Sequence, residues 1–295
     1  MSETLYIPAL DASAVASIVA TAIGRIAFEL RPDVLQAMRE ALVLDNNPYS
    51  RRALDMLIEN AQIAATDRVP LCQDTGSVWV LLEVGPTETG TPSIASNIFS
   101  QVDAAVSWLW RENRLRNSML TDALLDRSNT GGNTPALCEL AFNPDVTGIR
   151  LSVMLKGGGS DNASRTAMLN PGDGWPAIRQ FVVSSVAEKA ANACPPLIIG
   201  VGVGSSFDKV AGFAKKALLK NIDQESDQPE IRIYEAELLE AINQLDVGAG
   251  AMGGITTALA VRLITAPCHM ASLPVAVNIG CSAMRSVSYE LVGEW

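Results

Sequence analysis

One short polar segment, Cys72-Gln73-Asp74-Thr75-Gly76, combines residue types that could do chemistry. It places a thiol, an amide, a carboxylate and a hydroxyl side by side, between an apolar helical pattern and an apolar strand pattern. Loops at such junctions commonly carry the binding and catalytic groups of α/β proteins. A thiolate is a ligand for soft metal ions. Any further ligands must come from distant parts of the sequence, because none of the cysteines forms a CxxC pair.

The other cysteines differ in their surroundings. Cys194 and Cys281, like Cys72, lie beside Gly, Pro or Asn, where a thiolate could face a shared cavity. Cys138 lies in an apolar segment that we expect to begin a helix and to belong to the core, and the role of Cys268 stays open. Their separations match no zinc or ferredoxin spacing, and a small buried apolar residue is the alternative for each of them. Spacing alone therefore leaves a metal site undecided.

Two glycine-rich segments could also approach a ligand. Residues 200–206 follow a predicted strand, but they lack the GxGxxG spacing and the Lys-Ser/Thr pair of a phosphate-binding loop, so we expect close packing of strand on helix. Residues 156–162 contain three consecutive glycines, Gly157, Gly158 and Gly159, which weaken any helix or strand. This second segment is either a ligand contact or a tight bend.

The elements that must position these residues follow from hydrophobic periodicity. The pattern predicts a mixed α/β fold: a helical N-terminal part, about 10–66, then an α/β part, about 67–295, with a small sheet and Gly-rich loops at strand ends. We expect one catalytic domain over residues 1–295. The predicted helices are one capped by Asp11, one opening at Pro32, and others at about 50–66, 97–115, 175–192, 207–220 and 234–245. The predicted strands are 78–84, 149–155, 197–203 and 273–279, while 255–265 is either helix or strand and 221–232 an exposed linker.

Composition narrows the functional class. The chain has 295 residues, is 48% hydrophobic and 18% charged, and has a net charge of −10. This charge argues against a nucleic-acid partner, although a few focused cations could still bind a small anion. No apolar run is long enough to span a bilayer, and the N-terminal segment has no basic region typical of a signal peptide. We therefore expect a cytoplasmic protein that does not bind membranes and whose cysteines are reduced, buried or metal-bound.

Several longer motifs resemble the alpha family of iron–sulfur hydro-lyases, which comprises class I fumarases and the alpha subunits of fumarate hydratases and L(+)-tartrate dehydratases. The resemblance runs in the expected order from about residue 10 to 285. It rests on CQDTG (72–76), SNTGGNTP (128–135), KGGGSDN (156–162), ACPP (193–196), GVGVGSSF (200–207), KKALL (215–219), MGGITTALAV (252–261) and APCHMASLPVAVNIGC (266–281).

The resemblance implies a cofactor. Cys72, Cys194 and Cys281 would hold three irons of a 4Fe-4S cluster, and the fourth iron would stay open to substrate as a Lewis acid. Positive groups would then stabilise the aci-carboxylate that forms as a C–H proton leaves.

The resemblance also implies roles for other residues. Gln73 and Asp74 would line the substrate site, with Asp74 a proton-transfer residue, although an Asx-turn is an alternative role for that carboxylate. Arg116, with Arg114 as its rival, would hold a substrate carboxylate, unless it is merely an exposed arginine at a helix end. The backbone of Gly157 to Gly159 would approach substrate and cluster. His269, the only histidine, matches an active-site histidine of the family, with a structural histidine as the alternative.

Some features depart from the family pattern. Asp161 stands where Glu is more usual, Asn113 where Gly is common, and the basic, His-containing run after the third cysteine is replaced by Ser282-Ala283-Met284-Arg285-Ser286. One-chain members continue into a second domain with a catalytic lysine, which we do not find here. We therefore expect an alpha subunit whose site is completed by a beta subunit, in a heterotetramer of two alpha and two beta subunits.

The resemblance implies a hydro-lyase that acts on a C4 hydroxydicarboxylate of the malate/fumarate type. The alternatives are an alpha subunit of L(+)-tartrate dehydratase or of a mesaconate/citramalate hydratase, and a non-catalytic paralogue of the same fold. A nucleotide-binding protein that uses the Gly-rich segments is a weaker hypothesis, because the phosphate-binding motifs are absent.

Overall fold

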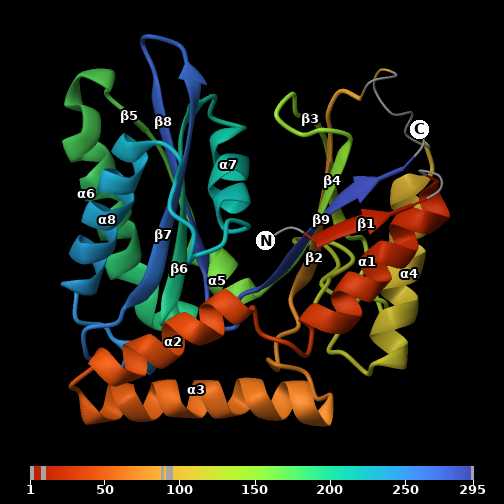
Figure 1. Ribbon diagram of the computed structural model, residues 1–295, viewed down its shortest axis with the longest axis horizontal. Helices are drawn as coiled ribbons and strands as arrows, with labels where there is room; N and C mark the ends of the chain where they lie inside the picture. Colours follow the sequence, from red (N-terminus) through yellow and green to blue (C-terminus); the bar gives the residue numbers. More distant parts are fainter. Residues whose placement is uncertain (1–2, 8–10, 88–89, 91–95, 294–295) are drawn as a thin grey trace. The chain divides into compact units, whose positions relative to one another are not determined.

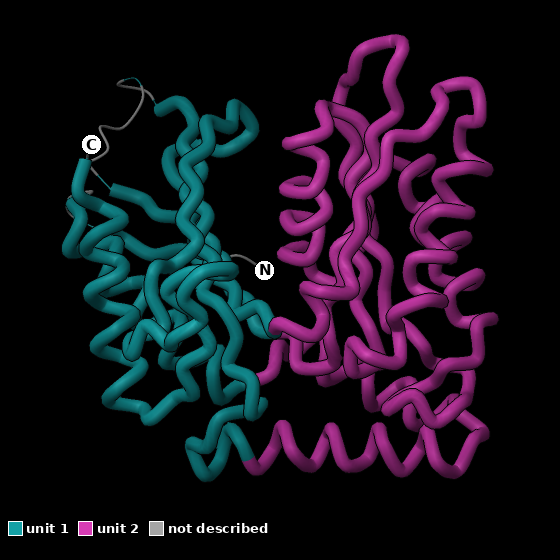
Figure 2. The backbone as a smooth tube through the Cα atoms, turned by 180° about the vertical axis from the view of Figure 1, so that it is seen from behind, with its two compact units in different colours: residues 1–29, 64–157, 285–295 teal, residues 30–63, 158–284 magenta. Residues whose placement is uncertain are grey.

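The computed structural model describes residues 3–7, 11–87, 90 and 96–293. The chain forms two compact units, which Figure 2 distinguishes by colour. Unit 1 comprises residues 1–29, 64–157 and 285–295, and unit 2 comprises residues 30–63 and 158–284. Each unit has its own mixed sheet, which confirms the predicted mixed α/β class with helices in the N-terminal part.

Unit 1 contains a five-stranded sheet in the order β1-β9-β4-β2-β3. Its strands are β1 (Glu3–Tyr6), β2 (Ser77–Val84), β3 (Leu137–Phe142), β4 (Ile149–Lys156) and β9 (Arg285–Val292). β4 lies antiparallel between β2 and β9, whereas the pairs β2–β3 and β1–β9 are parallel. Two helices, α1 (Ala12–Ile26) and α4 (Ile98–Glu112), contribute apolar side chains that form one core with β2, β4 and β9 (Figure 1).

Local sequence explains the best-predicted elements of unit 1. The carboxylate of Asp11 accepts a hydrogen bond of 2.7 Å from the Ala14 N–H and so caps α1, as predicted. The predicted strands 78–84 and 149–155 are β2 and β4, which are buried along almost their whole length. Continuous apolar runs of this length suit central strands that are covered on both faces.

Unit 2 contains a four-stranded sheet in the order β5-β8-β6-β7. Its strands are β5 (Arg165–Leu169), β6 (Leu197–Ser205), β7 (Ala258–Cys268) and β8 (Leu273–Gly280). Its helices are α2 (Pro32–Leu44), α5 (Gly158–Asn162), α6 (Gly174–Lys189), α7 (Val210–Ala217) and α8 (Pro229–Asn243), with short 3-10 turns η1 (Pro171–Asp173), η2 (Ala190–Ala193) and η3 (Ala249–Ala251). Helix α3 (Pro48–Asp67) begins in this unit and ends in unit 1. Figure 1 shows α6 and α8 on one face of the sheet and α7 on the other.

The glycines of β6 allow α7 to pack closely on the sheet. A Cβ atom on Gly200 would lie 2.1 Å from the carbonyl oxygen of Ala214, and one on Gly202 would lie 2.5 Å from that of Val210. Any side chain at either position would therefore clash with the α7 backbone. This confirms the expectation that residues 200–206 serve close strand–helix packing.

Two predictions of secondary structure need correction, and the open choice between helix and strand for 255–265 resolves to a strand. Cys138 lies in β3 and not in a helix, because Val80 of β2 pairs with it in the sheet and this pairing outweighs local helical preference. Its side chain is half-buried against the unit 1 core, and burial raises the pKa of the thiol to about 12. The ambiguous segment 255–265 belongs largely to strand β7, and residues 158–162 form a one-turn helix despite their glycines.

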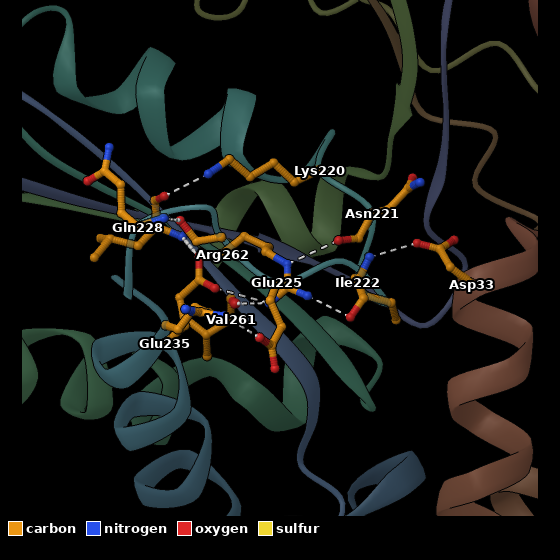
Figure 3. Close-up of polar contacts among 12 residues, drawn as sticks. Asp33, Lys220, Asn221, Ile222, Glu225, Gln228, Glu235, Val261 and Arg262 are labelled. Atoms are coloured by element: carbon orange, nitrogen blue, oxygen red, sulfur yellow. Dashed lines mark hydrogen bonds and ion pairs between the residues drawn. The ribbon is translucent and has the colours of Figure 1, made fainter. Parts of the chain in front are cut away.

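A network of hydrogen bonds anchors the linker after α7 (Figure 3). The sequence predicted this linker, residues 221–232, to be exposed. Arg262 of β7 is buried, and its guanidinium donates to the carbonyl oxygens of Asn221 at 3.1 Å and Ile222 at 2.6 Å. The same guanidinium donates to Glu235 of α8 at 3.3 Å. The start of the linker is therefore held against the sheet by a paired, buried arginine.

Among the described residues, no helix combines the length and the apolar character needed to cross a membrane.

Candidate functional site

The Cys72–Gly76 segment forms a tight turn between α3 and β2. The carboxylate oxygen Oδ1 of Asp74 accepts a hydrogen bond of 3.0 Å from the Gly76 N–H, which is an Asx-turn. Gly76 has a φ of +84°, and a Cβ atom on it would lie 2.3 Å from the Lys156 carbonyl oxygen. Only glycine therefore lets this turn lie against the end of β4. The Asx-turn predicted as an alternative role for Asp74 is therefore present. A carboxylate in such a turn can also transfer a proton.

Two distant loops hold this turn. The hydroxyl of Ser118 donates to Asp74 Oδ1 at 3.3 Å, and the Ser118 N–H donates to Asn133 Oδ1 at 2.7 Å. Asn133 is fully buried and donates through its amide nitrogen to the Gly76 carbonyl oxygen at 3.0 Å. Ser118 and Asn133 thus connect their two loops to the turn around Asp74. Neither residue was assigned a role from the sequence, although Asn133 lies in the SNTGGNTP motif and Ser118 lies two positions after Arg116.

Arg285, at the start of β9, also reaches the turn and was not predicted as a site residue. Its Nη2 donates to the Asp74 carbonyl oxygen at 2.9 Å, and the side chain is only 1% exposed. Its Nε and Nη1 are buried and have no hydrogen-bond partner among the described residues. The hydroxyl of Thr75, in the same turn, is likewise buried without a partner.

The predicted substrate-binding side chains of unit 1 lie on the surface, whereas Gly157 is buried. Gln73, Arg114 and Arg116 are exposed, and the structure gives neither arginine side chain a hydrogen bond or ion pair within the described part of the chain. Trp110 of α4 donates to the carbonyl oxygen of Arg116 at 3.0 Å and fixes the backbone there. Both arginines are thus available to an anion, and the choice between them stays a prediction. Gly157 is buried at the end of β4.

Unit 2 brings Cys194 and Cys281 to the same end of its sheet. Cys194 follows η2, just before β6, and Cys281 directly follows β8, where Ile198 pairs with Gly280. The N–H of Ser282 donates to the Cys194 carbonyl oxygen at 3.0 Å. Cys194 has a φ of +56°, a left-handed conformation that costs a non-glycine residue about 1–2 kcal/mol. The fold thus holds this cysteine in a strained position beside the second cysteine loop.

Helix α5 lies at this same end of the sheet. A Cβ atom on Gly159 would lie 3.4 Å from the carbonyl oxygen of Asn192, in the turn that precedes Cys194. Gly158 and Gly159 are both exposed. Gly159 is therefore a neighbour of the turn before Cys194 within unit 2, and the substrate-binding role of the glycine segment stays a prediction.

His269 lies at the other end of the same sheet, in the exposed connection between β7 and β8 at the top of Figure 1. The eight residues of β8 separate it from Cys281, which corresponds to about 26 Å along the strand. Its Nδ1 accepts a hydrogen bond of 3.1 Å from the Ala271 N–H, so the neutral ring carries its proton on Nε2. Within unit 2 the fold does not bring His269 to the two cysteines.

The donor set can be compared with that of an iron–sulfur centre. None of the five cysteines, all of which the structure describes, is in a disulfide; Cys194 is exposed, and Cys72 and Cys281 are partly exposed. Within the described ranges, no three His, Cys, Asp or Glu side chains gather closely enough to hold a metal ion. Cys72 belongs to unit 1 and the other two belong to unit 2. Each of these three thiols lies in a loop beside a strand and outside any disulfide, so each is chemically suited to ligate iron.

Comparison with known proteins gives a consistent result. Residues 16–290 match the family described as fumarate hydratase (fumerase). A protein from Methanocaldococcus jannaschii, provisionally named L(+)-tartrate dehydratase subunit alpha, is 36% identical over 262 residues, which cover 88% of this chain and 91% of that relative. The L(+)-tartrate dehydratase subunit alpha of Escherichia coli K12 is 27% identical over 272 residues, covering 91% of this chain and 88% of that relative.

Proposed function

Since this chain belongs to the fumarate hydratase (fumerase) family and is a hydro-lyase of the fumarase/tartrate dehydratase type, we propose that it is the alpha subunit of an enzyme that dehydrates L-tartrate or a close C4 hydroxydicarboxylate. With L-tartrate, a hydroxyl group leaves one carbon and a proton leaves the neighbouring carbon, and together they form water. The enol that results rearranges to the 2-oxo acid.

The observation that carries the proposal is the similarity to two tartrate dehydratase alpha subunits over about nine-tenths of each chain. From the sequence alone, a malate/fumarate substrate is the first expectation and L-tartrate is one of the alternatives. The relatives support that alternative better. A fumarate hydratase alpha subunit remains the second candidate, because the matching family is described by that activity.

We propose Cys72, Cys194 and Cys281 as the ligands of a 4Fe-4S cluster. Three observations support this set: none of the three thiols is in a disulfide, Cys194 and Cys281 lie on hydrogen-bonded loops of unit 2, and Cys194 has a strained backbone. When bound, the cluster would supply a Lewis-acidic iron for the departing hydroxyl. Cys138 is not part of the set, because its thiol has a pKa of about 12 and packs against the unit 1 core.

Asp74 is the proposed proton-transfer residue of this chain. The Gly76 N–H and the Ser118 hydroxyl fix its Oδ1, so the carboxyl group has a defined direction before substrate arrives. A carboxylate positioned in this way can accept the proton that leaves the substrate carbon.

The remaining proposed residues would bind and orient the substrate. The exposed guanidinium of Arg116 would pair with a substrate carboxylate, which a chain of net charge −10 must attract locally. Gln73 would donate to a substrate oxygen, and the exposed backbone at Gly158 and Gly159 would approach it closely. His269, whose Nε2–H is a donor, is kept as a proposed catalytic residue, although a single copy of unit 2 does not place it beside the cysteines.

An alpha subunit implies a beta subunit. We propose that the partner completes the active site in a complex of two alpha and two beta subunits. The partner would then supply the cations and proton-transfer groups that this chain does not bring to the Asp74 turn.

The test is anaerobic reconstitution of the alpha–beta complex with iron and sulfide, followed by assays on L-tartrate, D-tartrate, malate and citramalate. We expect L-tartrate to be the best substrate, turnover to require both chains, and Cys72→Ser to lose cluster and activity. Cys268→Ser is the matched control, since this exposed cysteine is outside the proposed ligand set. Preferred turnover of malate would favour the second candidate, and a complex that binds no iron in wild-type form would refute the cluster.

A further inference from the structure

A buried, unpaired guanidinium lies under the Cys72–Gly76 turn. Among the described residues three arginines are buried: Arg31, Arg262 and Arg285. The first two have carboxylate partners, Asp33 and Glu235. Arg285 has no such partner, and its one hydrogen bond goes to the Asp74 carbonyl oxygen at 2.9 Å. Burying a charge without compensation is strongly unfavourable, so this arrangement implies an anion that completes it.

The surroundings of Arg285 make a purely structural role insufficient. Strand periodicity places it on the face of β9 that carries Tyr289 and Leu291, which belong to the apolar core of unit 1. Its strand partner is Leu155 of β4, also a core residue. A simple packing role at this position would be served better by an apolar side chain. The positive charge and the several N–H donors of the guanidinium, and not its packing, therefore explain an arginine at position 285.

The unpaired polar atoms concentrate at this turn. Five buried side-chain nitrogen or oxygen atoms lack partners in the described part of the protein, and three of them are Arg285 Nε, Arg285 Nη1 and Thr75 Oγ1. All three are donors or can act as donors. Thr75 and Asp74, the residue that Arg285 holds, follow Cys72 within three positions. Arg285 itself follows Cys281 by four positions.

We propose that Arg285 is a positioning residue for the iron–sulfur centre. Its Nε–H and Nη1–H donate hydrogen bonds to sulfur atoms of the cluster held at Cys72, while Nη2 fixes the turn through Asp74. This inference rests on the proposed function, and it assigns a role to a residue that the proposed ligand set does not include. Hydrogen bonds to sulfur and nearby positive charge are known determinants of cluster potential and stability.

The burial of Arg285 indicates that its hydrogen-bond acceptor is a permanently bound group and not the substrate. Substrate must enter from water, so groups that bind it are exposed in the empty site, as Arg116 is. The two unpaired nitrogens of Arg285 have no contact with solvent. The donors therefore serve a group that is inserted once and retained.

The experiment compares wild type, Arg285→Lys, Arg285→Gln and Arg150→Gln in the reconstituted complex. Arg150 is the matched control, because it lies on the same sheet but forms a partly exposed ion pair with Glu290 at 2.6 Å. The readouts are the rate of iron loss to a chelator, the reduction potential of the cluster and the KM for L-tartrate.

We expect Arg285→Gln to lose iron about 10-fold faster or more, since the loss of a residue that hydrogen-bonds a metal ligand commonly weakens a metal site by that factor. Its potential should become more negative, because removing a positive charge disfavours the reduced cluster. Arg285→Lys keeps the charge but loses the fork of donors, so it should lie between wild type and Arg285→Gln. Arg150→Gln should match wild type.

Wild-type rates and potential in Arg285→Gln would overturn the inference. So would a raised KM with unchanged iron loss, which would assign Arg285 to the substrate carboxylate. If Arg285→Gln does not fold, Arg285→Lys decides, and wild-type iron loss in that variant would overturn the inference. A wild-type complex without iron would instead refute the proposed cluster, so the two failures are distinguishable.

Discussion

Two buried arginines, one in each unit, have opposite environments. Arg262 in unit 2 donates from all three guanidinium nitrogens, to Asn221, Ile222, Val261 and Glu235 (Figure 3). Arg285 in unit 1 donates from one nitrogen only, to the Asp74 carbonyl oxygen. The same fold thus contains one complete polar network and one that lacks its anion. The difference distinguishes an arginine that stabilises the folded chain from one whose unpaired donors we propose to bind an anion.

The complete network should give the largest effect on stability. Arg262→Gln leaves Glu235 buried without its partner, and we expect the free energy of unfolding to fall by about 3–5 kcal/mol. Chemical denaturation of the full chain measures it. The control is Arg232→Gln, which removes a largely exposed pair with Glu225 and should cost about 1 kcal/mol or less. A smaller decrease in the free energy of unfolding than in the control would show that Arg262 does not stabilise the chain. Arg262 and Arg285 would then no longer differ in this respect.

A second effect concerns the acid sensitivity of the complete network. Burial alone would raise the pKa of Asp33, but the hydrogen bond and charge of Arg31 and the Ile222 N–H outweigh it and lower the pKa. The stability that this pair supplies is therefore present above the unfolded pKa of about 4 and is lost as pH falls through the lower folded pKa. Asp33→Asn should remove this dependence and cost about 1.5–3 kcal/mol at neutral pH. Unfolding curves from pH 2 to 7 test both, and an unchanged slope in the variant would contradict the assignment.

Substitution of Arg285 should change the free energy of unfolding much less than substitution of Arg262. In the cluster-free chain, Arg285→Gln removes one hydrogen bond but also an uncompensated buried charge, so we expect the free energy of unfolding to change by about 1 kcal/mol or less. The measurement is the same denaturation experiment as for Arg262→Gln. A loss comparable with that of Arg262→Gln would mean that Arg285 is structural and would weaken the inferred role.

The contrast between the two arginines could not be read from the sequence. Strands β2 and β4 were predictable, because continuous apolar runs need burial on both faces. Strand β9 was not predicted, because RSVSYELV lies beyond the last predicted strand, 273–279. Arg285 was noted only as part of the segment 282–286 that departs from the family pattern, and pairing with β4 buries it.

The candidate site shows the same limit. Motif resemblance identified Cys72 and Asp74, whereas Ser118 and Asn133 became visible only when the fold brought three loops together. In the opposite direction, the sequence grouped His269 with the cysteines, and an intervening strand separates them within unit 2. The predicted strand 273–279 between His269 and Cys281 already implies this separation, whereas the contacts among the three distant loops around Asp74 needed the structure.

The smallest expected effect concerns two buried hydroxyls. Ser50 in unit 2 donates to Asp45 at 2.6 Å and accepts the Ala249 N–H at 3.2 Å, whereas the Thr75 hydroxyl has no partner among the described residues. Thr75→Val keeps the shape of the side chain and removes an unpaired polar atom. The free energy of unfolding of the cluster-free chain should therefore fall by about 0.5 kcal/mol or less, or rise. Ser50→Ala breaks a satisfied pair and should cost about 1–3 kcal/mol. A large loss in Thr75→Val would show that the hydroxyl is already paired in the free chain. The turn at Cys72 would then be complete without an anion, and the contrast with the Arg262 network would disappear.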